Sequence, residues 1–262
     1  MEKISFSFGK NWKEFIDTHY SEDRVRRSQE HILNFLGVSS MKGQSFLDIG
    51  CGSGLSSAAA LKSGASNIVS FDLDPIAVEA TKKVWEISGK PKNWTVLQGS
   101  VLDDKFLSML EPADINYSWG VLHHTGKIWE AIEKASRLTK VGGQFYISIY
   151  LTTPEVDYWR KVKKLYNESS DEEKRMLECW QFVDKVYLPC RLQGKDPYET
   201  VIKNYVGRGM EYFTDLKDWL GGYPFETATV DEVIKFCTEK LGFSFKKNAM
   251  ISNPEYLFAR IK

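Results

Sequence analysis

A chain of 262 residues is long enough for one α/β domain with a sizeable core, with or without an insertion. Lys plus Arg equals Asp plus Glu at 35 each, so the net charge gives no argument for a nucleic-acid or membrane partner, and a nucleic-acid partner is not expected. The start MEKISFSFGK lacks the apolar segment of a signal peptide, no apolar run spans a bilayer, and the four cysteines form no CxxC pair. These features predict a cytoplasmic protein with reduced thiols and no membrane partner.

The pattern of the first 150 residues alternates between helices and strands. Residues 21–37 are expected to form a helix that begins at the cap Ser21 and ends at Gly37. Asp74 is expected to cap a second helix that has Pro75 at its first position, where a missing N–H costs nothing. The expected strands are SFLDI, NIVSFDL, WTVLQG, ADINYSW and GGQFYISIY. This alternation predicts an α/β fold with a doubly wound parallel sheet covered on both faces.

The pattern changes after residue 150. Residues 151–225 are charged and aromatic, with helical stretches and without clear strands, which indicates a helical insertion. TVDEVIKFCTEKLG then predicts a helix that begins with a capping box, and FSFKK and EYLFARI predict two closing strands that pair antiparallel. We therefore expect four parts: an N-terminal helical cap over 1–40, a cofactor-binding core over 41–150, a helical insertion or substrate lid over 151–225, and the closing helix and strands of the core over 226–262.

The first strand ends in a glycine-rich loop, FLDIGCGSGLSS, where a doubly wound sheet binds its ligand. The phosphate loop GxxxxGK[ST] is absent, and the third glycine comes one residue too early for the dinucleotide fingerprint GxGxxG. The spacing of Gly50, Gly52 and Gly54, with Asp48 in the preceding strand, favours S-adenosylmethionine (SAM). Asp48 and loop carbonyls could accept from the ammonium of SAM, and the amides at the start of the helix could donate to its carboxylate.

Two further signals follow the next two strands. Asp72 ends the second strand about twenty residues after the glycine loop, where a carboxylate binds both ribose hydroxyls of a nucleotide. Leu73 could pack on the adenine. After the third strand, LQGSVLD places Ser100 and Val101 where they could meet the adenine edge.

With these motifs in place, the chain resembles the class I SAM-dependent methyltransferases. The resemblance covers most of residues 45–150 and looks nearest to the small-molecule branch that includes the ubiquinone and menaquinone methyltransferases, in an uncharacterised bacterial subgroup. It implies a Rossmann-like, seven-stranded sheet with one antiparallel strand. It also implies that the loop Asp48, Gly50, Cys51, Gly52 and Gly54 holds the methionine part of SAM. Many relatives have Asp where this chain has Ser100, which changes the expected adenine contact.

Three side chains outside the cofactor motifs are candidates for the chemistry. His123 and His124 follow the fourth strand, near the expected methyl acceptor, and a neutral imidazole there could serve as a general base. A structural role, with the imidazole bonded to a loop carbonyl, stays open for both. Arg208 is the candidate for an anionic group of the substrate, and a surface salt bridge is the alternative. No set of close ligands predicts a zinc site.

The sequence therefore predicts a SAM-dependent methyltransferase that acts on an oxygen, nitrogen or carbon atom of a small molecule and releases S-adenosylhomocysteine (SAH). The fourth strand is followed by SWGVLHHT where an NPPY-like motif of nucleic-acid and protein amide methyltransferases would stand, which disfavours that chemistry. Two alternatives stay open: an RNA or protein methyltransferase, and a SAM-binding protein that does not methylate. The sequence does not specify the oligomeric state.

Overall fold

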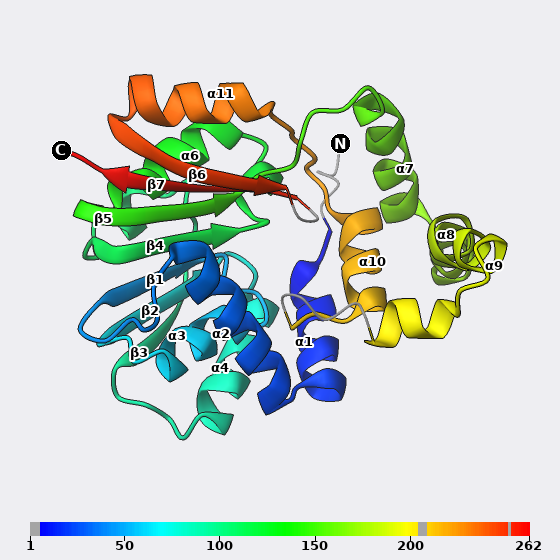
Figure 1. Cartoon of the computed structure of the whole chain (residues 1–262), viewed down its shortest axis with the longest axis horizontal. Coiled ribbons are helices and arrows are strands. Elements are labelled where there is room, and N and C mark those ends of the chain that lie inside the picture. The colour runs from blue at the N-terminus through cyan, green and yellow to red at the C-terminus, as the bar shows by residue number, and fades with distance from the viewer. Residues whose placement is uncertain (1–5, 204–208, 251–252) are drawn as a thin grey trace.

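The computed structural model describes residues 6–203, 209–250 and 253–262 and contains a seven-stranded sheet (Figure 1). Its strands lie in the order β3-β2-β1-β4-β5-β7-β6. They are β1 Ser45–Ile49, β2 Asn67–Asp72, β3 Trp94–Gln98, β4 Ala113–Trp119, β5 Thr139–Ser148, β6 Phe243–Met250 and β7 Pro254–Arg260. Only β7 runs against its neighbours, pairing antiparallel with both β5 and β6. The predicted Rossmann-like sheet with one antiparallel strand is confirmed.

Helices cover both faces of the sheet, and each face has its own apolar core. One core joins the sheet to α1 Phe8–His19, α2 Glu22–Leu36, α3 Leu55–Lys62 and α4 Pro75–Ile87. The other joins it to α5 Asp104–Leu107, α6 Ile128–Arg137, α11 Val230–Lys235 and its π-helical continuation η4 Phe236–Lys240. The central strands β1, β4 and β7 are therefore mostly buried, as their near-continuous apolar sequences require, whereas the edge strands β3 and β6 are partly exposed.

The helix ends follow the local signals of the sequence. Ser21 caps α2 by accepting from the N–H of Arg24, and Gly37 ends the helix in the left-handed conformation that glycine adopts freely. Asp74 caps α4 by accepting from the N–H of Ile76, with Pro75 at the first position. Thr229 opens α11 with the predicted capping box.

The segment between β5 and α11 is helical and lies beyond the carboxyl ends of the parallel strands (Figure 1). Its helices are α7 Val156–Glu168, α8 Asp171–Phe182, η2 Val183–Tyr187, α9 Leu188–Leu192, η3 Glu199–Lys203 and α10 Tyr212–Gly221. Tyr166, Leu216 and Leu220 form a small apolar core between α7 and α10. This placement puts α7 and α10 beside the edge of the sheet where a ligand is expected.

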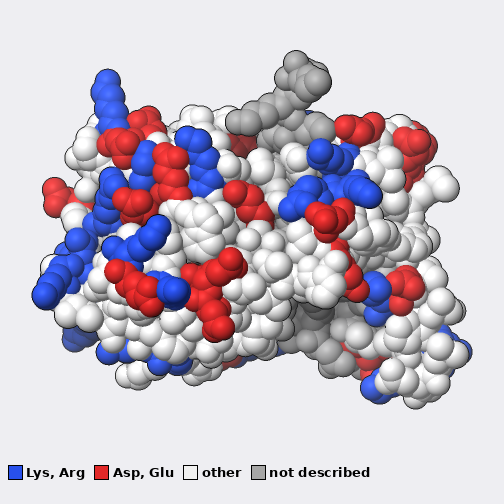
Figure 2. Space-filling model, turned by 90° about the horizontal axis from the view of Figure 1, so that it is seen from above, with Lys and Arg blue, Asp and Glu red and all other residues white. Residues whose placement is uncertain are grey.

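The surface carries both signs of charge. Figure 2 shows one face on which Lys and Arg side chains lie among Asp and Glu side chains. Within residues 6–203, 209–250 and 253–262, no helix has the length and apolar composition that a membrane crossing requires.

Candidate active site

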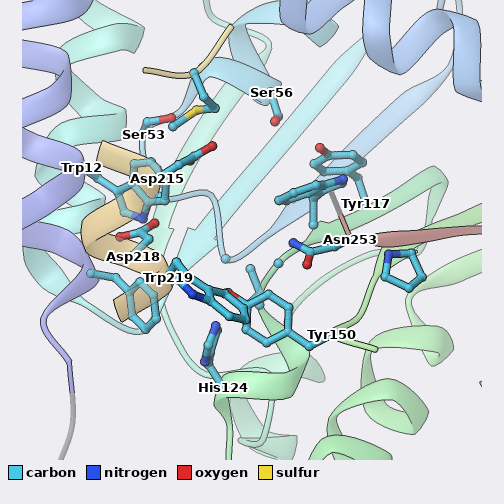
Figure 3. Close-up of a pocket in the computed structure, with 18 of the residues that line it drawn as sticks. Trp12, Ser53, Ser56, Tyr117, His124, Tyr150, Asp215, Asp218, Trp219 and Asn253 are labelled. Atoms are coloured by element: carbon cyan, nitrogen blue, oxygen red, sulfur yellow. The ribbon is translucent and has the colours of Figure 1, made fainter. Parts of the chain in front are cut away.

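A cavity of about 610 Å³ lies over the carboxyl ends of β1 and β4, at the point where the strand order reverses. Figure 3 shows Trp12, Asp215 and Asp218 on one side of it, Tyr117 and Asn253 across from them, and His124 and Tyr150 on a third side. Its lining comes from α1, α2, the glycine loop, the ends of β4 and β5, and α7 and α10. The volume is in the usual range of small-molecule sites.

The glycine loop uses most of its own amides to hold its shape. The N–H groups of Gly50 and Cys51 both donate to the carbonyl of Phe71, and that of Gly54 donates to Cys51. Gly50 has a φ of +74°, and a Cβ on it would come within 2.4 Å of Val121. The amides that remain to bind an anion are therefore those at the start of α3, around Ser53 and Ser56, which line the cavity.

Asp48 lies on the cavity wall at the end of a buried hydrogen-bond chain. The indole N–H of Trp94 donates to Ser70 Oγ at 2.8 Å, Ser70 and Ser57 share a bond of 2.6 Å, and Ser57 donates to Asp48 Oδ2 at 2.5 Å. Asp48 is 2% exposed. Burial, which outweighs the Ser57 hydrogen bond, raises the pKa of the carboxyl to about 7, and the charge of Asp72 adds to the shift.

Asp72 fastens the glycine loop to the end of β2. Its Oδ2 accepts from the N–H of Gly52 at 3.0 Å, and its Oδ1 accepts from the N–H of Asp74 at 3.0 Å. Burial raises its pKa to about 6 in spite of these hydrogen bonds. Asp48, which is buried, and Asp72, which is half-buried, thus border one cavity, and each takes up a proton more readily than an exposed carboxyl does. This is the environment expected of groups that await a cationic or hydroxyl-bearing ligand.

Of the other predicted cofactor contacts, Cys51 lines the cavity and Leu73, Ser100 and Val101 do not. Cys51 lies at the cavity, where the Thr81 hydroxyl donates to its Sγ. Leu73 is 68% exposed and Val101 packs in the second apolar core, while the Ser100 hydroxyl accepts from the N–H of Leu102. Leu73, Ser100 and Val101 are not part of the cavity lining. Their adenine contacts stay predictions.

The two adjacent histidines point in different directions. His123 is fully buried, its Nδ1 accepts a long hydrogen bond from the N–H of Tyr150, and its ring packs against the Tyr150 ring at a tilt of 33° with centroids 3.9 Å apart. His124 lines the cavity, with Nδ1 2.7 Å from the carbonyl of Pro224. Burial lowers the pKa of both rings, that of His124 to about 3. His124 is thus the ring that lines the cavity, because the 3₁₀ turn Leu122–His124 directs His123 into the protein interior.

Arg208, the predicted contact for an anionic substrate, lies outside the described residues, so its role stays a prediction. The cavity walls that α1, α7, α10 and the segment after β5 contribute are aromatic and acidic. They include Trp12 of α1, Tyr150 after β5, Trp159 of α7, and Asp215, Asp218 and Trp219 of α10.

Helix α1 connects the two halves of the cavity wall. Its Gly9 N–H donates to Asp74 Oδ2 at 2.9 Å, so α1 is fixed to the first turn of α4. Two residues later in the chain, Asn11 is 6% exposed, and its side-chain amide donates to the carbonyl of Thr214 and to Asp218 Oδ1 of α10. Gly9 has no room for a side chain, because a Cβ would come within 2.6 Å of the backbone of Ala77. Asp74 therefore acts both as a helix cap and as the anchor of α1.

This double role predicts a measurable loss of stability. Asp74→Ala should lower the free energy of unfolding by about 1–2 kcal/mol, since it removes the cap and the acceptor for Gly9. Asp74→Asn should lose less, because asparagine caps nearly as well and gives up one oxygen only. Denaturant unfolding measures both values. Equal stability of Asp74→Ala and the wild type would contradict the anchoring role.

Comparison with known proteins gives the family. The family model of ribosomal protein L11 methyltransferase (PrmA) matches residues 30–175. A curated ribosomal protein L11 methyltransferase from Acinetobacter baumannii (strain SDF) is 29% identical over 165 residues, 62% of this chain and 49% of the relative. That from Pectobacterium atrosepticum is 30% identical over 122 residues, 46% of this chain and 38% of the relative. The chain thus spans at most about half the length of these relatives.

Solved structures agree with the fold. Magnesium protoporphyrin IX methyltransferase from Synechocystis PCC 6803, with bound SAH, aligns over 96% of this chain and 93% of its own with a TM-score of 0.57 at 13% identity. The predicted nearness to the ubiquinone and menaquinone branch is not confirmed by these comparisons. Because its family model covers more than half of the sequence, the chain belongs to the ribosomal protein L11 methyltransferase (PrmA) family of SAM-dependent methyltransferases, and its cofactor is SAM.

Proposed function

We propose that this protein transfers the methyl group of SAM to a small molecule enclosed in the cavity. The observation that carries the proposal is that one cavity joins the glycine loop to a second set of walls built by α1, α7 and α10. An acceptor held there is surrounded by protein on several sides. A protein or RNA acceptor would need a groove open to a long chain.

The described residues fit SAM at the glycine-loop end. Asp72 would hold the ribose hydroxyls, Asp48 would face the ammonium, and the amides around Ser53 and Ser56 would hold the carboxylate. SAM supplies a methyl group on a positively charged sulfur. The protein's own contribution is alignment of the acceptor and exclusion of water, for which the aromatic walls are suited. We propose further that residues 151–225 form a lid that sets the choice of acceptor.

The family name itself favours a second candidate, a ribosomal protein acceptor. However, the matched residues 30–175 contain the glycine loop and Asp72 but not α1 or α10, which build much of the rest of the cavity wall. Trp12, Asp218, Trp219 and Asn253 all lie outside the match. The similarity to these relatives therefore supports the same cofactor more strongly than it supports the same acceptor.

An acceptor screen tests the two candidates. Purified protein is incubated with SAM and, separately, with a panel of small phenols, alcohols, amines and carboxylic acids, and with bacterial ribosomal protein L11. We expect SAH to form above background with at least one class of small molecule and not with L11. Methylation of L11, shown by an intact-mass increase of the protein, would reverse the assignment.

A further inference from the structure

A histidine that the sequence did not single out lies on the same cavity, paired with a buried carboxylate. His31 of α2 lines the cavity and its side chain is 11% exposed. Its Nε2 lies 2.9 Å from Glu255 Oε1, and Glu255 of β7 is 0% exposed. The two residues are 224 positions apart in the chain.

The strand register places this pair at the acceptor end of the cavity. Trp119, the last residue of β4, pairs with Ser148, and Ser148 pairs with Glu255 on the antiparallel strand β7. Glu255 therefore lies two strands beyond the end of β4, on the side away from β2 and Asp72. A group held near His31 is thus on the side opposite to the predicted ribose contact.

The ionisation state of Glu255 determines which ring nitrogen of His31 carries the hydrogen. Besides His31, the carboxylate accepts from the indole N–H of Trp119 at 2.6 Å and from the hydroxyl of Tyr146 at 2.9 Å. Burial raises the pKa of Glu255, but these hydrogen bonds and the nearby His31 together hold it below its ordinary value, so the group is ionised. An ionised carboxylate only accepts, which means that Nε2 of His31 carries the hydrogen. In a neutral ring the lone pair is then on Nδ1, which has no hydrogen-bond partner within the described part of the chain.

We propose that His31 is a catalytic residue that takes the proton of a phenolic hydroxyl acceptor, with Glu255 as its positioning residue. The proposal rests on the proposed methyl transfer and names its acceptor class. The O–H bond breaks and its proton goes to Nδ1 of His31. The oxygen lone pair forms the bond to the methyl carbon, and the carbon–sulfur bond breaks with its electron pair on sulfur. The positive charge thus passes from sulfur to an imidazolium that is hydrogen-bonded to Glu255.

Two features favour a phenol as the acceptor: an imidazole is a weak base, and the walls of the cavity are aromatic. A phenol, with a pKa of about 10, gives its proton to an imidazole far more readily than an aliphatic alcohol does. Aromatic side chains also surround the cavity and would pack against a phenol ring, among them Trp12, Tyr117, Trp119, Tyr150 and Trp219. His123 and His124 are poor candidates for this base, because burial lowers the pKa of both rings.

A coloured phenol tests the proposal without methyl transfer. The full chain is saturated with SAH and titrated with 4-nitrophenol at a pH below the pKa of the free phenol, and the yellow phenolate band is followed. We expect the wild type to bind the probe as phenolate. His31→Gln should lose the band while SAH affinity, measured by calorimetry, is kept. Glu255→Gln should weaken the band, and His19→Gln, on the exposed end of α1, is the matched control that should retain it.

Three outcomes would overturn the proposal: no phenolate band with the wild type, a band that persists in His31→Gln, and a band lost in His124→Gln instead. Because Glu255→Gln can unfold the β7 end, its SAH affinity and melting temperature are measured beside the band, and the His31 variant decides the case. No methyl donor is present in this experiment. Failure of the acceptor screen would therefore count against methyl transfer to small molecules and leave the base assignment to be judged by the band.

Discussion

Asp72→Ala should weaken SAH binding by about a hundredfold to ten-thousandfold. The change removes two predicted charge-assisted hydrogen bonds to the ribose, worth about 1.5–3 kcal/mol each. It also frees the Gly52 amide, which now donates to Asp72 Oδ2, so the glycine loop loses one of its attachments to β2. Calorimetric titration of purified protein with SAH measures the dissociation constant.

Two further variants separate these contributions. Asp72→Asn can still accept from Gly52 but carries no charge, so its affinity should fall between those of the wild type and Asp72→Ala. Asp231→Ala removes an exposed carboxylate in the first turn of α11, away from the cavity lining, and should bind SAH as the wild type does. An unchanged dissociation constant in Asp72→Ala would show that another acid holds the ribose.

Local signals in the sequence predicted much of the fold. Ser21, the pair Asp74 and Pro75, and the capping box at Thr229 each depend on residues within four positions of one another, so the sequence alone displays them. The antiparallel closing strands were predicted in the same way, from two β-rich runs around a short turn, although β6 continues to Met250 beyond the expected FSFKK. The glycine loop and the acid at the next strand end were found because their spacing is local as well.

The acceptor side of the cavity depends on contacts that no local pattern contains. His31 meets Glu255, and Asn11 meets Asp218, across 224 and 207 positions. No local sequence pattern indicates either contact, because each forms only when β7 lies beside β5 and α1 lies beside α10. The direction of His123 was also not predictable, because a 3₁₀ turn, Leu122–His124, sets which of two adjacent rings faces the cavity. The sequence therefore pointed to the glycine loop and Asp72, which line the cavity, and gave no sign of His31 or of the contact between Asn11 and Asp218.

The affinity for SAH should fall as the pH is lowered from 8 to 5. In the free protein, burial raises the pKa of Asp48 to about 7 and that of Asp72 to about 6, so both carboxyls take up protons within this range. A neutral carboxyl attracts neither the ammonium nor the ribose hydroxyls well, so the ligand selects the ionised forms. Binding then releases a proton for each carboxyl that must ionise, and each proton released costs up to about tenfold in affinity per pH unit.

The sign follows from the direction of the shifts. Because the pKa of each free carboxyl is raised and the ligand lowers it again, affinity is highest above pH 7, begins to fall as Asp48 is protonated, and falls more steeply below pH 6 as Asp72 joins it. Over three pH units the loss is on the order of a hundredfold to a thousandfold if both groups must be ionised in the complex. Calorimetry in two buffers with different ionisation enthalpies counts the protons released. Asp48→Asn should bind more weakly at pH 8 but with a flatter profile, since one of the two titrating groups is gone. A profile as steep as that of the wild type in this variant would place the proton uptake on a group other than Asp48.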